Sequence, residues 1–488
     1  MKVVMATSEM VPFAKTGGLA DVSGALPKYL GKVGVEAVTF MPLYSKVKDS
    51  EHKITDTGVT IDIAVGDRIK QAQIFKTYVP GTKAVVYLVG NDEYFDREEL
   101  YGTPHGDYAD NASRFVFFSR AVLECCLHFD IKPDVIHCHD WQSALIPVYV
   151  KTLFSERFER RPATLLTIHN LAYQGVFWHW DMKLTGLSWE LFNWRELEFH
   201  GKLNFLKGGI VFADAINTVS PTYAKEIQTP EFGAGMQEIL RFRSDSIFGI
   251  INGIDYDVWN PKKDEHIPCK FGPKSINNKG RNKKKLLEEV GLPTDRKLPL
   301  IGMISRLAAQ KGLDLIAEIL DDIAKLDVQV VLLGTGEKKY QDMLEDFSKR
   351  YPEKICAKIM FDNGLAHRIE AGSDMFLMPS RYEPCGLNQL YSLKYGTLPI
   401  VRKTGGLADT ITDVTPENIE NGTATGFMFE RYNSSELLEA IKRAVNLYSN
   451  RKVWREMVQT AMKQDWSWGN SARKYSELYE DVIGWKDA

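Results

Sequence analysis

The sequence predicts an α/β protein with two doubly wound parallel-sheet domains that face a cleft. Its 488 residues exceed what one hydrophobic core normally supports, so two domains are expected. Short β-branched runs alternate with longer amphipathic stretches in both halves, which is typical of parallel sheets covered by helices on both faces. The heptapeptide KTGGLAD also occurs once in each half, at residues 15–21 and 403–409. Ligands of such sheets bind outside the carboxyl ends of the strands.

The expected strands are short apolar runs, and each half has its own set. In the first half they lie at residues 2–7, 36–42, 83–90, 134–140, 163–169, 214–220 and 246–252. In the second half they lie at residues 298–305, 328–334, 354–360, 374–380 and 398–403. Helical patterns occupy residues 109–129, 141–154, 283–290, 472–485 and the stretch after residue 433. A further helix follows the first KTGGLAD, and we expect Pro27 to interrupt it.

The domain boundary is predicted from a polar stretch in the middle of the chain. Residues 260–285 contain three prolines and the basic run KGRNKKK. Such a run is more typical of a solvated helix start than of a nucleic-acid patch. We therefore expect an N-terminal domain over residues 1–255, a C-terminal domain over 256–465 and a terminal helical segment over 466–488.

Composition and charge exclude several classes of protein. The formal charge of −3 gives no reason to expect nucleic acid or an anionic membrane as partner, so phosphate binding must depend on local cations. The six cysteines form no CxxC pair and no disulfide pattern. The first residues do not suit a secretory signal, and no apolar run is long enough to span a membrane. The sequence therefore predicts an enzyme of the reducing cytoplasm, and it allows a homo-oligomer.

KTGGLAD offers a glycine pair at the start of a helix. Backbone N–H groups at Gly17 and Gly18 can approach an anion closely, where the helix dipole also favours negative charge. Lys15 and Lys403 each add a positive charge. The sequence is neither a Walker loop nor a dinucleotide fingerprint. A tight turn that requires glycine is the alternative, but two copies at matching places favour ligand contact.

Two stretches of the second half place charged groups at strand ends. SRLAAQKGLDL brings Arg306 and Lys311 to the end of one expected strand, where they suit a diphosphate unless they are simply solvated. PSRYEPCGLNQL places Glu383 before residues 385–387, which we expect to begin a helix with free N–H groups. A catalytic thiol at Cys385 is disfavoured because no His–Asp set accompanies it.

Three histidines mark strand ends of the first half. His137 and His139 share a face of their strand, but no third ligand at usable geometry is evident, so a metal is not expected. His169 is expected to face the cleft because its neighbours Asn170 and Gln174 are polar.

Four tryptophans lie close together in the first half, at Trp178, Trp180, Trp189 and Trp194. Their flat rings either stack on sugars or form a satellite cluster under a long loop. The sequence favours neither interpretation.

Several stretches of the chain together point to one protein family. They are KTGGLAD, HDWQSAL, TIHNLAYQG, INGIDYDVWNP, SRLAAQKGLDL, PSRYEPCGLNQLYSLKYGTLPIVRKTGGLADT and the terminal DWSWGNSARKYSELY. Taken together, these stretches resemble bacterial glycogen synthases of the ADP-glucose starch synthase type. The match runs from about residue 1 to 480, in order. The resemblance implies a GT-B fold whose last helix returns to the N-terminal domain. It also implies transfer of glucose from ADP-glucose to the non-reducing end of an α-1,4-glucan, with retention and without a metal or cofactor.

The resemblance further implies roles for individual residues. A catalytic set is implied at Lys15, His169, Arg306, Lys311 and Glu383. The donor diphosphate would lie against the three cations, Gly17 and Gly18. Glu383 and the amides of Cys385, Gly386 and Leu387 would meet the donor glucose. Its pocket would be lined by Asp140, His169 and Asn252, and the donor would be covered by Thr404, Gly405 and Gly406. Phe361 lies where the family tends to place an aromatic ring near adenine.

Two features of the sequence concern motifs that other glycosyltransferases carry. Many retaining GT-B enzymes carry a second glutamate eight positions after the first, and here that position is Tyr391. Residues 255–257 spell the D-x-D motif of metal-dependent glycosyltransferases, but turn chemistry explains them better. Retention without a second carboxylate favours same-face attack assisted by the leaving phosphate. A UDP-sugar transferase, a phosphorylase and a non-catalytic glucan- or nucleotide-binding protein are the alternatives.

Overall fold

The computed structural model describes residues 1–103 and 105–487, and the chain divides into two compact units. Unit 1 comprises Met1–Gly253 together with the C-terminal segment that begins at Trp468, and unit 2 comprises Ile254–Ser467. Pro104 and Ala488, which fall in the predicted segments 1–255 and 466–488, lie outside the described residues.

Unit 1 contains, within the described residues, a nine-stranded sheet in the order β14-β13-β9-β8-β1-β2-β5-β4-β3. The strands predicted from apolar runs are all present, as β1 (Lys2–Ala6), β2 (Glu36–Pro42), β5 (Val85–Gly90), β8 (Val135–His139), β9 (Ala163–Ile168), β13 (Ala215–Thr218) and β14 (Ile247–Gly249). These strands pair in parallel. The loops after their carboxyl ends therefore gather at one edge of the sheet.

An antiparallel hairpin at the sheet edge was missed by the sequence prediction. It consists of β3 (Thr55–Val65) and β4 (Arg68–Tyr78), and β4 pairs antiparallel with β5. Its strands alternate polar and apolar residues because one face packs on the core and the other meets solvent, so no long apolar run marks them. The unit is thus a mixed sheet, not a purely parallel one. Shorter strands complete the unit, namely β6 (Gly102–Thr103), β7 (Gly106–Asp107), β10 (Val176–Phe177), β11 (Glu198–Phe199) and β12 (Lys202–Asn204).

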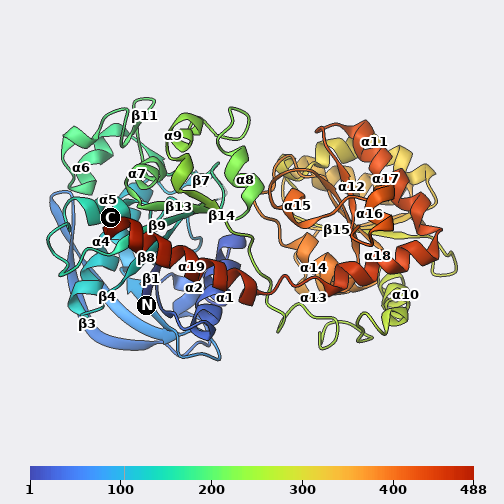
Figure 1. Ribbon diagram of the computed structural model, residues 1–488, viewed down its shortest axis with the longest axis horizontal. Helices are drawn as coiled ribbons and strands as arrows, with labels where there is room; N and C mark the ends of the chain where they lie inside the picture. Colours follow the sequence, from blue (N-terminus) through green and yellow to red (C-terminus); the bar gives the residue numbers. More distant parts are fainter. Residues whose placement is uncertain (104, 488) are drawn as a thin grey trace. The chain divides into compact units, whose positions relative to one another are not determined.

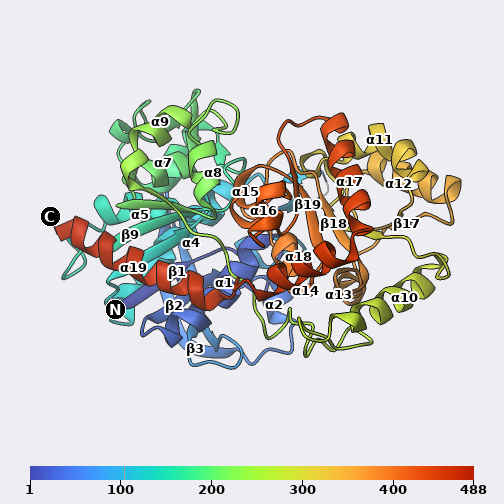
Figure 2. The same ribbon diagram turned by 45° about the vertical axis from the view of Figure 1, so that its right-hand side comes forward.

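Helices cover both faces of this sheet, as Figures 1 and 2 show. They are α1 (Gly18–Lys32), α2 (Ser45–Lys48), α3 (Asp92–Phe95), α4 (Asn111–His128), α5 (Leu145–Lys151), α6 (Met182–Thr185), α7 (Phe205–Phe212), α8 (Pro221–Glu226), α9 (Gln237–Phe242) and α19 (Trp468–Asp487). One core cluster includes the apolar face of α4, and a second joins β1 to α1 and α19.

Helix α1 continues through Pro27, so the predicted interruption is wrong. Val22, Leu26 and Leu30 are fully buried in the second core cluster. Packing of this apolar face outweighs the one backbone hydrogen bond that proline removes. Helix α19 runs beside α1 and buries Tyr475 and Tyr479 completely, which attaches the C-terminal segment to unit 1 (Figure 2).

Unit 2 holds a six-stranded parallel sheet among the residues described, in the order β17-β16-β15-β18-β19-β20. Its strands are β15 (Leu300–Ile304), β16 (Gln329–Leu333), β17 (Ile355–Lys358), β18 (Met375–Met378), β19 (Leu398–Arg402) and the unpredicted β20 (Phe427–Phe429). The helices are α10 (Lys279–Val290), α11 (Leu313–Lys325), α12 (Lys338–Arg350), α13 (Asn363–Gly372), α14 (Asn388–Tyr395), α15 (Gly405–Thr410), α16 (Pro416–Glu420), α17 (Ser434–Tyr448) and α18 (Arg451–Lys463). None of the described helices of either unit is both long and apolar enough to cross a bilayer.

Helix α10 begins four residues earlier than predicted because Lys279 is a core residue rather than part of a solvated run. Its ammonium donates to the carbonyl oxygens of Glu370, Ala371 and Tyr395 at 2.9, 3.1 and 3.0 Å, and to the Thr397 hydroxyl at 2.7 Å. The Glu370 carboxyl is buried beside it, and burial raises the pKa of this group to about 8.

This raised pKa makes the stability of unit 2 depend on pH. The folded state keeps the Glu370 proton between pH 4.5, its ordinary pKa, and about 8, whereas the unfolded state loses it. The contribution of Glu370 to stability is therefore lost as the pH rises through this window. We expect Glu370→Gln to match the unsubstituted protein near pH 4.5 and to exceed its free energy of unfolding above pH 8, by on the order of a few kcal/mol. Urea unfolding at both pH values measures this difference, and equal stabilities at high pH would contradict it.

Candidate active site

The first KTGGLAD loop, between β1 and α1, is held by a buried glutamate. Glu9 is 4% exposed, and its carboxylate accepts hydrogen bonds from the Thr16 backbone N–H and hydroxyl at 2.5 Å each, and from the Gly17 N–H at 3.1 Å. The Tyr101 hydroxyl donates to the same carboxylate at 2.8 Å. Sequence reasoning missed Glu9, whose only signal was an acid placed shortly after a buried strand.

The glycines of this loop have no internal packing reason to be glycine. A Cβ added at Gly17 or Gly18 would meet nothing within 4 Å, and both residues are exposed. Beside them the Lys15 side chain is 51% exposed and pairs with Asp21 at 2.7 Å. Burial raises the pKa of Asp21, which Lys15 partly offsets. The loop thus exposes its two glycines and a cation on the surface of unit 1. Glu9 already binds the Gly17 N–H, and the backbone at Gly18 stays accessible to an external anion.

The second copy, between β19 and α15, uses its glycines differently. Gly405 has φ +43°, and a Cβ there would lie 2.0 Å from the Glu383 carbonyl oxygen. A Cβ at Gly406 would lie 2.1 Å from the Cys385 carbonyl oxygen, and the Gly406 N–H donates to the Glu383 carbonyl at 3.1 Å. Thr404 is buried. The two glycines of the second copy therefore pack tightly under a neighbouring loop, which the repeat did not predict.

Unit 2 gathers charged groups where β15 and β18 end. Lys311, in a short turn of 3₁₀ helix (Ala309–Lys311), donates to the Glu383 carboxylate at 2.6 Å. The Ser380 hydroxyl donates to the same oxygen at 2.9 Å. Arg306 is exposed and forms no hydrogen bond or ion pair with any residue that the structure describes. An unpaired guanidinium at a strand end is available to a phosphate.

The loop after Glu383 differs from the prediction. Residues 385–387 precede a helix instead of beginning one, because α14 starts at Asn388 with Leu387 as its N-cap. Gly386 has φ +73°, a backbone conformation that suits glycine and breaks the helical geometry. The Gln389 amide donates to the carbonyl oxygens of Cys385 and Gly386 at 2.9 and 3.0 Å, which fixes the loop. Phe361, beyond the end of β17, is 89% exposed.

Asp140 and His169 meet where β8 and β9 end. The Asp140 carboxylate accepts the His169 backbone N–H at 2.7 Å, and burial raises the Asp140 pKa to about 7. Burial lowers the pKa of His169 to about 3. Asn252 lies beyond β14 and is 5% exposed. Its buried Oδ1 accepts no hydrogen bond from the described residues, so a polar acceptor is left unused there.

Two other positions singled out in the sequence have structural partners. Tyr391 stacks on Trp259 with ring centroids 3.9 Å apart, and Trp259 stacks on His367 at 3.8 Å. An aromatic residue at position 391 therefore serves packing within unit 2. The Asp257 backbone N–H donates to the Asp255 carboxylate at 2.9 Å, which confirms the predicted turn chemistry.

Three of the four tryptophans form a surface cluster. Trp180 lies edge-on to Trp178 and Trp189, with ring centroids 6.3 and 5.5 Å apart. All four rings are exposed, from 45% for Trp189 to 72% for Trp194. Trp178, Trp180 and Trp189 cluster, as one interpretation held. All four rings are nevertheless exposed and therefore stay accessible to a ligand.

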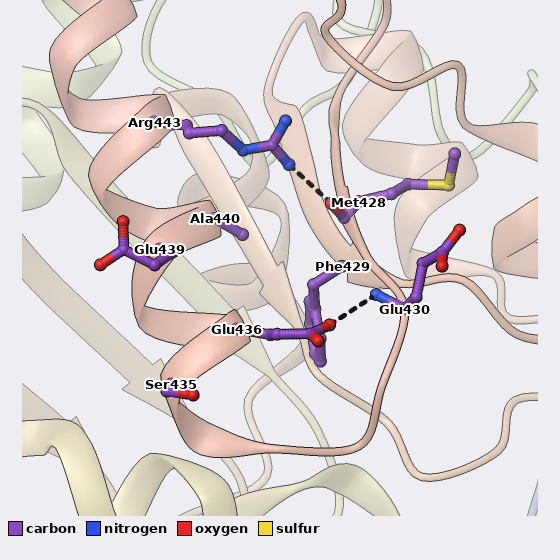
Figure 3. A pocket seen from close by; sticks show the side chains of 8 residues that line it. All are labelled: Met428, Phe429, Glu430, Ser435, Glu436, Glu439, Ala440 and Arg443. Atoms are coloured by element: carbon purple, nitrogen blue, oxygen red, sulfur yellow. Dashed lines mark hydrogen bonds between the residues drawn. The ribbon is translucent and has the colours of Figure 1, made fainter.

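A shallow pocket of about 310 Å³ lies elsewhere in unit 2, between β20 and α17 (Figure 3). Arg443 donates to the Met428 carbonyl at 2.6 Å, and Glu436 accepts the Glu430 backbone N–H at 3.2 Å. None of the predicted site residues lines it. We therefore do not consider it as the active site.

Comparisons with known proteins agree with this picture. The family model described as "Starch synthase catalytic domain" matches residues 2–242, and "Glycosyl transferases group 1" matches residues 284–460. Glycogen synthases from Thermosipho melanesiensis and Thermotoga maritima are 48% and 45% identical, each over 99% of both chains.

Solved structures extend the comparison. The catalytic domain of starch synthase IV from Arabidopsis thaliana, bound to ADP and acarbose, is 33% identical, with a TM-score of 0.91 over 99% of both chains. Sucrose-phosphate synthase from Thermosynechococcus elongatus, at 15% identity and a TM-score of 0.60 over 99% of both chains, shares the fold alone. The predicted GT-B class, with two Rossmann-like domains, is confirmed. The chain belongs to the glycogen synthase family, and it is a glycosyltransferase that transfers glucosyl groups to a glucan.

Proposed function

We propose that this enzyme transfers glucose from ADP-glucose to the non-reducing end of an α-1,4-glucan with retention of configuration. Two observations at the strand ends of unit 2 carry the proposal, namely the exposed Arg306 without a partner among the described residues and the Lys311–Glu383 ion pair. A diphosphate is the ligand that such cations favour. The starch synthase that this chain resembles was solved with ADP and acarbose, which supports adenine as the base.

The proposal also assigns the donor contacts, which the family resemblance implies. The C-terminal domain, predicted over residues 256–465, is the nucleotide-sugar side. There Arg306 and Lys311 hold the diphosphate, Glu383 and the amides of residues 385–387 meet the glucose, and the adenine lies near Phe361. Thr404 and Gly405 support the Glu383 loop and lie beside the donor. The N-terminal domain, predicted over residues 1–255, is the acceptor side, and its Lys15, Gly17 and Gly18 also contact the diphosphate. We assign Asp140, His169 and Asn252 to the glucose.

The chemistry follows from charge. The bond between C1 of glucose and the diphosphate oxygen breaks, so negative charge develops on ADP while the sugar becomes oxocarbenium-like. Fixed cations at the diphosphate stabilise this transition state more than the ground state. The 4-hydroxyl of the glucan then bonds to C1 from the face that ADP leaves. Its proton passes to the departing phosphate oxygen, which accounts for retention without a second carboxylate.

A direct assay separates the competing functions. The full chain is incubated with glycogen and glucose-labelled ADP-glucose or UDP-glucose, and label in the washed polymer is counted. The proposal predicts incorporation from ADP-glucose well above that from UDP-glucose. The reverse order would indicate a UDP-sugar transferase, and binding of donor without incorporation would indicate a non-catalytic protein.

The cellular setting is part of the proposal. All six cysteines lie in the described part of the chain and are free thiols. Free thiols suit a reducing compartment. We therefore propose a cytoplasmic enzyme that acts on a polymer made there.

The exposed tryptophans lead to a prediction about the acceptor. Indole faces stack on the apolar faces of pyranose rings, and Trp178 and Trp194 are the most exposed of the four. We expect the double variant Trp178→Ala, Trp194→Ala to raise KM for glycogen about tenfold and to leave KM for ADP-glucose unchanged. Phe242→Ala, which removes an 88%-exposed ring outside the cluster, is the control. Unchanged KM for glycogen in the double variant would assign the rings another role.

A further inference from the structure

Two histidine rings meet edge to edge where β8 and β9 end. His139 is the last residue of β8, and His169 directly follows β9. The two strands are parallel neighbours, with His139 opposite Thr167. The His139 Nδ1 and the His169 Nε2 are 3.0 Å apart. His139 is fully buried, so this contact is its main link to the proposed site.

Only one of the two nitrogens in this contact can donate if both rings are neutral. Burial lowers the pKa of His139 well below its ordinary value and that of His169 to about 3, so each ring carries one N–H. The other nitrogen of His139, Nε2, is buried and has no hydrogen-bond partner among the described residues. A buried orphan N–H costs more than an unused lone pair and is much rarer in proteins. The proton of His139 therefore sits on Nδ1, which donates to His169.

This assignment fixes the tautomer of His169. Its Nε2 accepts from His139, so its own proton sits on Nδ1. His169 is only partly buried, and its Nδ1 is not among the buried polar atoms that lack a partner. The Asp140 carboxylate meanwhile holds the His169 backbone N–H at 2.7 Å. The imidazole therefore presents a hydrogen-bond donor from a fixed main chain.

We propose that His139 is a positioning residue that holds His169 as the Nδ1–H tautomer, so that His169 donates a hydrogen bond to an oxygen of the bound sugar nucleotide. This inference rests on the proposed function for the identity of the ligand. Without His139 the His169 ring is free to carry its proton on Nε2. Its Nδ1 then offers a lone pair and can no longer donate a hydrogen bond to a hydroxyl or phosphate oxygen.

The test compares two substitutions of His139 in the full chain. His139→Phe keeps a ring but removes both nitrogens, whereas His139→Asn retains an N–H near the position of Nδ1. NMR of protein labelled with ¹⁵N-histidine distinguishes a protonated from a bare ring nitrogen, and the His169 signals are identified by their loss in His169→Gln. We expect Nδ1–H at His169 in the unsubstituted protein and in His139→Asn, and a shift toward Nε2–H in His139→Phe.

Kinetics provide the second readout. We expect His139→Phe to lower kcat about tenfold to a hundredfold, as loss of an outer partner of a functional histidine typically does, with a smaller change in KM for the donor. His139→Asn restores most of kcat. His137→Phe is the matched control, because His137 is equally buried but bonds to Tyr479 and Thr167 at 2.8 and 2.6 Å. It loses thermal stability and keeps both the His169 tautomer and kcat.

Two results would overturn the inference. One is an Nε2–H tautomer at His169 in the unsubstituted protein, and the other is His139→Phe with unchanged tautomer and kcat. A protein that shows no glucosyl transfer from any donor contradicts the proposed function instead. The NMR measurement still decides the tautomer in that case, so the two failures are distinguishable.

Discussion

Arg306→Ala lowers kcat at least a hundredfold while the free energy of unfolding stays unchanged. Arg306 forms no hydrogen bond or ion pair with the residues described in the structure, so its removal costs the fold little. Its guanidinium is proposed to meet the charge that develops on the departing diphosphate, and loss of one such donor typically costs about 3–4 kcal/mol of transition-state stabilisation. Steady-state kinetics with ADP-glucose and glycogen, together with urea unfolding, measure the two effects.

The control for Arg306 is Arg281→Ala. Arg281 lies on α10, is also exposed and also lacks a hydrogen-bond or ion-pair partner among the described residues. We expect Arg281→Ala to keep kcat within about twofold of the value of the unsubstituted protein, since surface substitutions usually have small effects. Lys15→Ala should behave as Arg306→Ala does, since Lys15 makes only a half-exposed pair with Asp21. Near-normal turnover in either variant would remove that residue from the proposed diphosphate contacts.

Lys311→Met is expected to damage both stability and catalysis. The Lys311 ammonium lies 2.6 Å from the Glu383 carboxylate, with side chains 20% and 9% exposed. Removing the cation leaves a nearly buried carboxylate uncompensated, which costs on the order of 3 kcal/mol of folding stability. Turnover should fall at least a hundredfold as well, because the same ammonium is proposed to face the diphosphate. Glu383→Gln, which keeps its size and the Ser380 contact, should cost less stability than Lys311→Met.

A second ion pair of unit 2 provides the comparison. Lys283 pairs with Asp374 at 2.5 Å, with side chains 14% and 15% exposed. Asp374 lies directly before β18, at the end of the strand opposite to Glu383. Lys283→Met should therefore lose stability but keep kcat once the protein is folded. If Lys311→Met shows the same pattern, with lost stability and normal kcat, its role is only structural.

Much of the fold could be predicted from the sequence because buried parallel strands are continuous apolar runs. The strands β1 and β15 are examples, and both were found. The hairpin β3–β4 was missed because its strands alternate polar and apolar residues and resemble surface loops. The predicted break of α1 at Pro27 was wrong, because tertiary packing of this helix overrides the local effect of the proline.

The site was harder to predict because its geometry depends on contacts between distant residues. Glu9 holds the first KTGGLAD loop together with Tyr101, which lies ninety-two residues away in the chain. The two copies of KTGGLAD are identical in sequence, yet Gly17 faces open space and Gly406 packs against Cys385. Local sequence cannot distinguish a glycine whose surroundings are open to a ligand from one that packs under a neighbouring loop.

The measurement that tests the central claim most directly is the affinity for ADP and for adenosine in the unsubstituted protein and in Arg306→Ala. Isothermal titration of the full chain gives both dissociation constants. If the guanidinium holds the diphosphate, the unsubstituted protein binds ADP far more tightly than adenosine, and Arg306→Ala loses most of that difference while its affinity for adenosine stays the same. Equal ADP affinity in the two proteins would contradict the account.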